Sequence, residues 1–226
     1  LFVVGALGIG SKRIIIRVKP LYSLLLAIIY LAFISLGLPD ALLGSAWPSM
    51  QPQMGVPMSY AGIVSTIIFV GTILSSLLSD RMTKKLGTGL VTAISVLMTA
   101  VALLGFSMSN AFWMLCLWAV PYGLGAGGVD AALNNYVAIH YASRYMNWLH
   151  CFWGIGATTG PYIMGYCLTT GRGWASGYRT IFVFQVVLTF VLFVSLPLWK
   201  KRDSGTGGKS DSQVLGLADI LKVRGV

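Results

Sequence analysis

The chain has 226 residues, of which 56% are apolar and only 22 are charged (16 basic and 6 acidic). A water-soluble domain of this length carries roughly a quarter of its residues as charged side chains, or about 55. With a mean hydropathy of +0.79, this shortage excludes an ordinary soluble domain and indicates an integral membrane protein. The net charge of +10 does not indicate nucleic-acid binding, because the basic residues lie between long apolar runs.

Six apolar segments follow one another along the chain, each long enough to cross a bilayer as a helix. We expect them at residues 21–50, 58–79, 87–107, 111–139, 147–169 and 178–199. Pro39 and Pro48 predict kinks in the outer part of the first span. Residues 51–57 are a charge-free linker, and residues 80–85 form a charged turn after the second span. The sequence therefore predicts an all-α integral membrane protein with six transmembrane helices.

The two ends of the chain differ in composition from this predicted bundle of residues 21–199. We expect residues 1–20 to be a basic cytoplasmic segment, and residues 200–226 to be a cytoplasmic Gly/Ser linker leading into a short amphipathic stretch at 214–223. Because the first residue is Leu1 and not Met, we interpret the sequence as a fragment or a truncated gene product. Whether residues 1–19 are native is left open.

A sequence repeat links the first and fourth spans. The pattern GxxDAxL occurs at residues 37–43 and again, three spans later, at residues 127–133. An offset of three spans makes the two copies run in opposite directions, which predicts an inverted 3+3 repeat. The pattern contains Asp40 and Asp130, the two acidic residues inside the expected spans.

Asp130 is the first candidate for a binding function. An ionisable group inside a membrane is costly and commonly marks a proton or solute path. Asn134 follows four residues later, so its amide lies on the same helix face as the carboxyl group. The alternative is a structural Asp that hydrogen-bonds Asn134 or a neighbouring helix. Asp40 is the second candidate, although its position near the outer end of its span also fits a helix-capping role.

Aromatic residues and a histidine provide further candidates. His150 and Trp153 lie at the start of the fifth span and could contact a proton or a solute, or belong to the interfacial aromatic belt. Cys116, Cys151 and Cys167 have no metal-ligand spacing. Neither a catalytic motif nor a nucleotide-binding motif is complete, so we expect no enzyme activity, cofactor or metal.

Residues 76–85, SLLSDRMTKK, resemble the loop motif GxxxD[RK]xGxx[RK] of the major facilitator superfamily. Ser76 and Thr83 stand where the superfamily has Gly. The resemblance implies half of a 12-helix fold, completed by a missing C-terminal six-helix half or by a second copy. It also implies a gating role for the charged residues of this loop, Asp80, Arg81, Lys84 and Lys85.

Residues 125–137 are similar to the fourth-helix motif of fucose permease-like sugar:proton symporters. Asp130, Asn134 and Tyr136 match its acid, amide and aromatic residue, whereas Asn135 replaces a Pro. The resemblance implies a secondary transporter in the plasma or inner membrane that moves a small polar solute, a sugar, together with protons. Asn135 enters the candidate site by its place in this motif.

Two alternatives remain. A drug:proton antiporter of the same superfamily is suggested by Gly156-x-x-x-Gly160-Pro161 in the fifth span, although the fourth span lacks the Arg expected of such antiporters. The other alternative is a truncated six-span membrane protein that transports nothing.

The distribution of Lys and Arg predicts the orientation of the bundle. Fourteen basic residues lie before the first span or after the second, fourth and sixth, whereas only Arg172 and Arg179 lie on the opposite side. Positive residues favour the cytoplasm, so both termini are expected there. Reporter fusions test this topology: a fusion after Lys200 should report cytoplasm and one within residues 51–57 the outside, and the reverse pattern would refute it.

Overall fold

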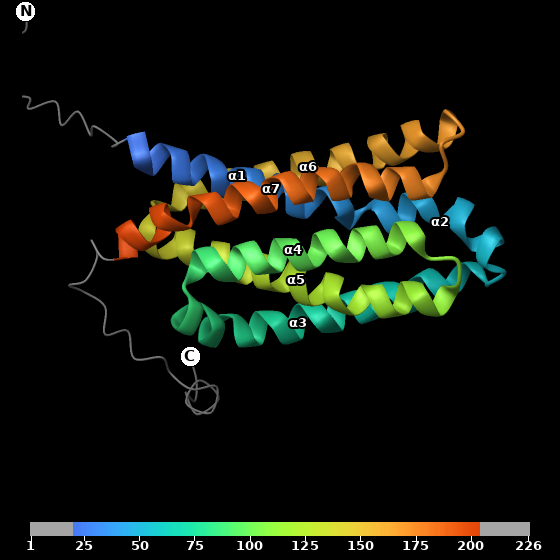
Figure 1. Ribbon diagram of the computed structural model, residues 1–226, viewed down its shortest axis with the longest axis horizontal. Helices are drawn as coiled ribbons and strands as arrows, with labels where there is room; N and C mark the ends of the chain where they lie inside the picture. Colours follow the sequence, from blue (N-terminus) through green and yellow to red (C-terminus); the bar gives the residue numbers. More distant parts are fainter. Residues whose placement is uncertain (1–19, 204–226) are drawn as a thin grey trace, which may run out of the picture.

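The computed structural model describes residues 20–203, which form helices and short turns without a strand (Figure 1). The expected basic segment before residue 20, and the linker and amphipathic stretch after residue 203, lie outside the described residues. The elements in chain order are α1 (Pro20–Asp40), α2 (Leu42–Met54), η1 (Met58–Tyr60), α3 (Ala61–Leu86), α4 (Thr88–Met108), α5 (Phe112–His140), α6 (Ser143–Thr169) and α7 (Trp174–Asp203).

Within residues 20–203, five helical segments are long and apolar enough to cross a membrane: Ser23–Met54, Met58–Leu86, Thr88–Met108, Phe112–His140 and Trp174–Trp199. They match five of the six expected spans. The sixth, α6, has 27 residues and packs along α1 within the bundle, but it is too polar to meet the same criterion. Membrane crossing by α6 therefore stays a prediction.

Two of the expected connections are wrong in detail. Residues 80–85 are not a turn, because α3 continues to Leu86 and the connection to α4 is Gly87 alone. The φ of Gly87 is +81°, a conformation that glycine adopts without steric strain. The helix that follows Pro39 also extends to Met54, which leaves only residues 55–57 between α2 and η1.

Of the two prolines expected to kink the first span, Pro39 alone lies beside an interruption of the helix. The helix is interrupted at Ala41, two residues after Pro39, where α1 ends and α2 begins. Pro48 lies inside α2 without interrupting it. The interruption at Ala41 directly follows Asp40, the second candidate acid.

The packing of the helices follows the inverted repeat. The extensive contacts are those of α1 with α6, of α5 with α3, of α4 with α5 and of α4 with α7. In an inverted repeat of three spans, α1 corresponds to α5, α3 to α6 and α4 to α7. The α1–α6 contact is therefore the counterpart of the α5–α3 contact, and the α4–α7 contact is its own counterpart. Contacts between α1 and α7, the counterpart of α5 and α4, are also present but less extensive.

Glycines at equivalent positions make the two corresponding helix contacts possible. A Cβ atom on Gly37 would collide with the Trp153 carbonyl oxygen of α6, and one on Gly127 with the Thr72 carbonyl oxygen of α3. These glycines begin the two copies of GxxDAxL. Small residues allow helix backbones to approach closely where lipid supplies no hydrophobic driving force. The repeat is therefore a repeat of packing as well as of sequence.

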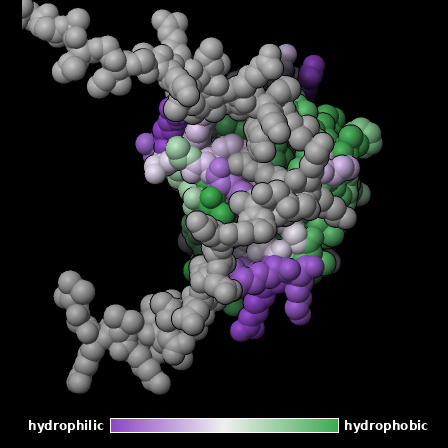
Figure 2. Space-filling model, turned by 90° about the vertical axis from the view of Figure 1, so that its left-hand side faces the viewer, coloured by the Kyte–Doolittle hydropathy of each residue, from purple (hydrophilic) through white to green (hydrophobic). Residues whose placement is uncertain are grey.

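The charged residues separate toward the two ends of the bundle. Arg81, Lys84, Lys85 and Arg144 belong to the helix ends near the start of α1 and the end of α7, on the left in Figure 1. Figure 2 views this end and shows hydrophilic residues gathered there beside a hydrophobic flank. This separation is the one expected from the sequence, whereas the side of the membrane that each end faces stays a prediction.

A glycine substitution tests the close packing of α1 on α6. In Gly160→Ala the new Cβ would meet the Leu38 carbonyl oxygen, so we expect the free energy of unfolding to fall by about 1–3 kcal/mol. Gly154→Ala is the matched control, because nothing lies within 4 Å of a Cβ at that position of the same helix. Unfolding in detergent measures both variants, and equal stabilities would contradict the proposed backbone contact.

Candidate functional site

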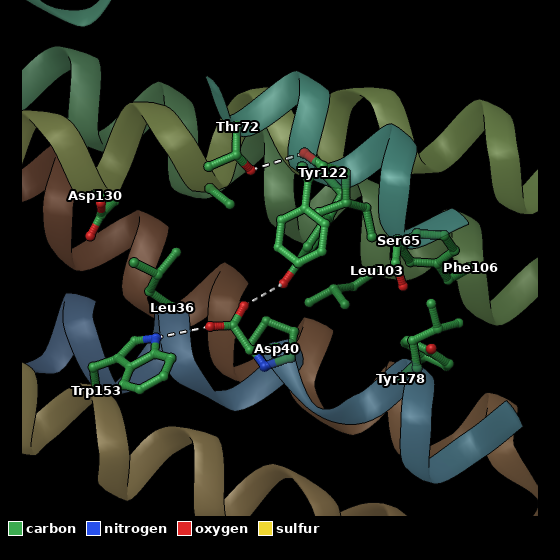
Figure 3. A pocket seen from close by; sticks show the side chains of 15 residues that line it. Leu36, Asp40, Ser65, Thr72, Leu103, Phe106, Tyr122, Asp130, Trp153 and Tyr178 are labelled. Carbon is green, nitrogen blue, oxygen red and sulfur yellow. Dashed lines mark hydrogen bonds between the residues drawn. The ribbon is translucent and has the colours of Figure 1, made fainter. Parts of the chain in front are cut away.

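A cavity of about 460 Å³ opens in the middle of the bundle (Figure 3). It lies where two apolar core clusters meet, one containing Leu36 and Ala126 and the other containing Leu103, Phe106 and Tyr122. Its lining comes from α1, α2, α3, α4, α5, α6 and α7 and consists of Leu36, Pro39, Asp40, Leu43, Ser65, Ile68, Phe69, Thr72, Leu103, Phe106, Tyr122, Ala126, Asp130, Trp153 and Tyr178. Every expected span therefore contributes to one central space.

The Asp40 carboxylate is held in this cavity by donors from two other helices. Trp153 of α6 donates its indole N–H to Oδ2 at 2.8 Å, and Tyr122 of α5 donates its hydroxyl to Oδ1 at 3.3 Å (Figure 3). Tyr122 is buried, whereas Asp40 is exposed to the cavity. Each carboxylate oxygen thus has one fixed partner and keeps a lone pair directed elsewhere.

The local break in the first span brings Asp40 to this position. Pro39 has no backbone N–H, so it weakens the helix around itself, and α1 ends at Asp40. The residue lies at mid-bundle beside the cavity and not at the outer interface. Of the two roles considered for Asp40, a binding group or a helix cap, the contacts favour the first, because its side chain bonds across helices.

Asp130 lies half-buried on α5 and also lines the cavity. Asn134 donates its amide N–H to the Asp130 Oδ1 at 2.9 Å, as the spacing of four residues predicts. The Asn134 Oδ1 atom is buried and has no hydrogen-bond partner within residues 20–203. His150 and Asp40 both lie within electrostatic range of Asp130. Among the described residues, the Asn134 carbonyl oxygen is therefore a hydrogen-bond acceptor without a partner, one helical turn from Asp130.

The remaining candidates lie at the edge of this site or outside it. His150 is exposed on α6 and packs edge-on against Phe33, with ring centroids 6.2 Å apart. Asn135 is exposed and is not among the lining residues of the cavity. The structure brings together Asp40, Asp130 and Trp153 in the cavity, with Asn134 joined through Asp130, and it leaves Asn135 apart.

The charged residues to which the loop resemblance assigns a gating role lie at the last turns of α3, far along the helix from the cavity. Lys84 pairs with Asp80 at 2.9 Å, and both side chains are about half exposed. Arg81 and Lys85 are also exposed. An exposed i, i+4 ion pair stabilises a helix by only about 0.3–0.5 kcal/mol, so this pair can open at little cost.

Sequence reasoning missed Tyr122 and Gln185. Tyr122 carries no signal beyond its place in an apolar span. Gln185 is buried in α7, where it donates to the Ser35 carbonyl at 2.9 Å and accepts a bond from Thr99 at 3.1 Å. It is the one Gln inside the expected spans, and this isolation in an apolar segment was a usable signal. Its bonds join α7 to α1 and α4.

Metal ligands do not cluster in the part of the chain that the structure describes. No group of three or more His, Cys, Asp or Glu side chains within residues 20–203 could hold a metal ion. The lining of the cavity can bind protons or ligands through the carboxylates of Asp40 and Asp130, and it can contact ligands through its aromatic rings.

Comparison with known proteins identifies relatives of the chain. A sequence model of the Major Facilitator Superfamily matches residues 2–224. Synaptic vesicle glycoprotein 2C of Rattus norvegicus is 24% identical over 173 residues, which cover 74% of this chain and 23% of that protein. Synaptic vesicle glycoprotein 2B of Homo sapiens is 23% identical over 180 residues, covering 77% and 26% respectively. The chain thus spans about a quarter of the length of these relatives.

The relatives named here give no support to the fucose permease-like branch, because they are synaptic vesicle glycoproteins. The part of the resemblance that stands is the superfamily itself and the multi-pass membrane fold that goes with it.

Cysteine accessibility tests the position of α5 at the cavity. In a background without the three native cysteines, Ala126→Cys and Asp130→Cys should react with a water-soluble thiol reagent, because both positions line the cavity. Val129→Cys and Leu133→Cys are the controls and should be protected, since neither position lines the cavity and both side chains are at most 1% exposed. Uniform protection along the helix would mean that Asp130 is packed away from water.

Proposed function

The chain belongs to the Major Facilitator Superfamily, and from this premise we propose that it forms the N-terminal half of a proton-coupled secondary transporter. The solute is small and polar, and a sugar is the class that the fourth-helix resemblance implies. The bundle works in the cell membrane with both termini in the cytoplasm. A second six-helix half, or a second copy of this bundle, closes the cavity from the other side.

One observation carries the proposal: two carboxylates from repeated positions on α1 and α5 line the same mid-bundle cavity. Carboxylates inside a membrane are costly unless they are paired, solvated or protonated. A cavity that opens alternately to each side of the membrane lets such groups exchange protons with each aqueous phase. That exchange is the event that couples a proton gradient to solute movement.

Asp130 is the proposed proton carrier. When the cavity is closed to both sides, its low dielectric disfavours the charged carboxylate. The closed bundle therefore reorients at smaller cost when the carboxyl group carries a proton or faces a bound solute. Asn134 binds the carboxylate when the proton is absent, since its amide donates to Oδ1, and its buried carbonyl oxygen is the group that we assign to solute hydroxyls.

Asp40 and Trp153 form the second part of the proposed site. The bond between the Asp40 carboxylate and the Trp153 indole fixes an aromatic ring at the cavity wall. Apolar ring faces stack on flat organic solutes while a neighbouring carboxylate accepts their hydrogen bonds. His150, within electrostatic range of Asp130, is the next candidate for a proton-binding group.

Gating at the cytoplasmic end is assigned to Asp80, Arg81, Lys84 and Lys85 by resemblance to the superfamily. Their exposed position at the end of α3 supports this assignment, because an exposed ion pair breaks and re-forms at small cost. The single-residue connection at Gly87 transmits a displacement of α3 directly to α4.

Asp130→Asn tests the mechanism in the complete transporter, reconstituted in proteoliposomes. The amide mimics a permanently protonated acid, so we expect accumulation of labelled hexoses against a gradient to fall to the level of protein-free liposomes. Exchange of labelled for unlabelled hexose across the membrane should persist, because exchange does not require the proton to leave.

Two other results would contradict the assignment. Full uphill uptake by Asp130→Asn would mean that the proton is carried elsewhere, with Asp40 and His150 as the next candidates. Loss of exchange as well would indicate a direct substrate-binding or structural role for Asp130. A wild-type protein that catalyses neither uptake nor exchange of any solute would support the non-transporting alternative.

A further inference from the structure

The polar groups of the cavity are unequally divided between acceptors and donors. Asp40 and Asp130 contribute two carboxylates, and the lining residues include no Lys, Arg or His. The cavity wall that this half provides is therefore rich in acceptors and carries a formal charge of −2 when both acids are ionised. Nothing in this wall supplies a compensating positive charge.

The donors in the lining are mostly occupied. The Trp153 N–H and the Tyr122 hydroxyl both donate to Asp40, and the Thr72 hydroxyl lies 3.0 Å from the Ile68 carbonyl oxygen and 3.2 Å from that of Gly123. Within the described residues, this leaves the hydroxyls of Ser65 and Tyr178 as lining donors without a hydrogen bond. A sugar presents many hydroxyl oxygens that accept as well as donate, and two hydroxyls cannot satisfy them.

Aromatic rings make up the rest of the recognition surface. Phe69, Phe106, Tyr122, Trp153 and Tyr178 all line the cavity. Aromatic faces attract cations through the ring quadrupole, and the attraction strengthens when water is excluded. Two carboxylates among five aromatic rings form a surface that is complementary to a positively charged organic molecule with an apolar body. A neutral polyol has no charge to pair with the carboxylates and little apolar surface to contact the rings.

We infer that the solute of this cavity is an organic cation, a protonated amine with an apolar or aromatic body, bound between Asp40 and Asp130. The inference rests on the proposed proton-coupled transport, and it replaces the sugar implied by the fourth-helix resemblance with a different substrate class. It also sets the direction of coupling. A carboxyl group that holds a proton releases it to solvent when the ammonium group binds, so the net charge of the cavity is unchanged and the solute and proton move in opposite directions.

The titratable groups that face the bound ammonium are known from the lining. They are Asp40 and Asp130, together with the phenols of Tyr122 and Tyr178, and His150 lies within electrostatic range of Asp130. The carboxylates are the lining groups to which we assign the exchange of a proton for a cation, because unperturbed phenols hold their protons to about pH 10. A positive charge on His150 would repel a bound cation, so His150 is not assigned to cation binding.

A matched pair of probes tests the inference on the purified protein in lipid nanodiscs. 2-Phenylethylammonium and 2-phenylethanol have nearly the same size and ring but differ in charge. By titration calorimetry we expect the ammonium to bind at least about thirtyfold more tightly than the alcohol, the difference expected of a desolvated ion pair. Glucose should bind no better than the alcohol. The heat of ammonium binding should vary with the ionisation enthalpy of the buffer, because protons are released.

Three substitutions locate the binding site. Asp40→Asn and Asp130→Asn should each weaken ammonium binding, and their thermal unfolding is recorded so that a loss of folding is recognised. Trp153→Phe keeps a ring but removes the donor to Asp40, and it should weaken binding less than Asp40→Asn does. Trp113→Phe is the matched control, because Trp113 is exposed on α5 and does not line the cavity.

The outcomes separate this inference from the proposed function. Equal binding of the ammonium and the alcohol, or ammonium binding that survives both aspartate substitutions in folded protein, overturns the cation assignment. If glucose binds and proton-driven hexose uptake is observed while the ammonium does not bind, the inference fails and the proposed transporter stands. If neither probe binds and no solute is transported, both fail.

Discussion

The carboxylate of Asp40 sets the main constraint on this bundle, because a charge in the middle of a membrane domain must be compensated by nearby groups. The compensation comes from Trp153 on α6 and Tyr122 on α5. One side chain on the first span therefore ties together helices that are distant in sequence. The cavity, its aromatic wall and the interrupted helix beside Pro39 all lie around this group.

The inverted repeat is preserved in packing but not in the chemistry of the two acids. Gly37 and Gly127 occupy equivalent close contacts, and α1 packs on α6 as α5 packs on α3. Asp40 takes its donors from two other helices, whereas the amide partner of Asp130 lies one turn away on its own helix. A shift of one helix against another therefore changes the environment of Asp40 more directly than that of Asp130, so the two acids are suited to different tasks.

Hydropathy alone predicts much of the fold, but it predicts a smaller part of the candidate site. Long apolar runs separated by charged or Gly-rich segments predict five of the spans with small errors at their ends, except that α3 continues to Leu86 where the sequence predicts an end at residue 79. The polar start of α6 is the exception, because Ser143, Arg144 and Asn147 lower its hydropathy although the residues are helical. The charge of residues 80–85 predicts a turn, but exposed charged residues are also common at helix ends, and Gly87 alone makes the connection.

The site was predicted in part, for a physical reason. Asp130 and Asn134 lie one helical turn apart, so their contact follows from sequence spacing. The bonds of Asp40 join residues separated by 82 and 113 positions, and only the three-dimensional packing brings such residues together. Tyr122 has no local sequence pattern that distinguishes it from an ordinary buried aromatic residue. Asn135 is a candidate only because of its position in the fourth-helix motif, and its side chain is exposed.

The bond between Trp153 and Asp40 has an optical consequence. The emission of an indole ring depends on the hydrogen bond of its N–H and on the polarity around it, and here both are set by a carboxylate at the wall of the cavity. Protonation of that carboxylate, or its engagement by a guest molecule, alters the excited state of the ring. The bundle thus contains an intrinsic fluorophore at the point where its chemical state changes, and no external label is needed to follow that change.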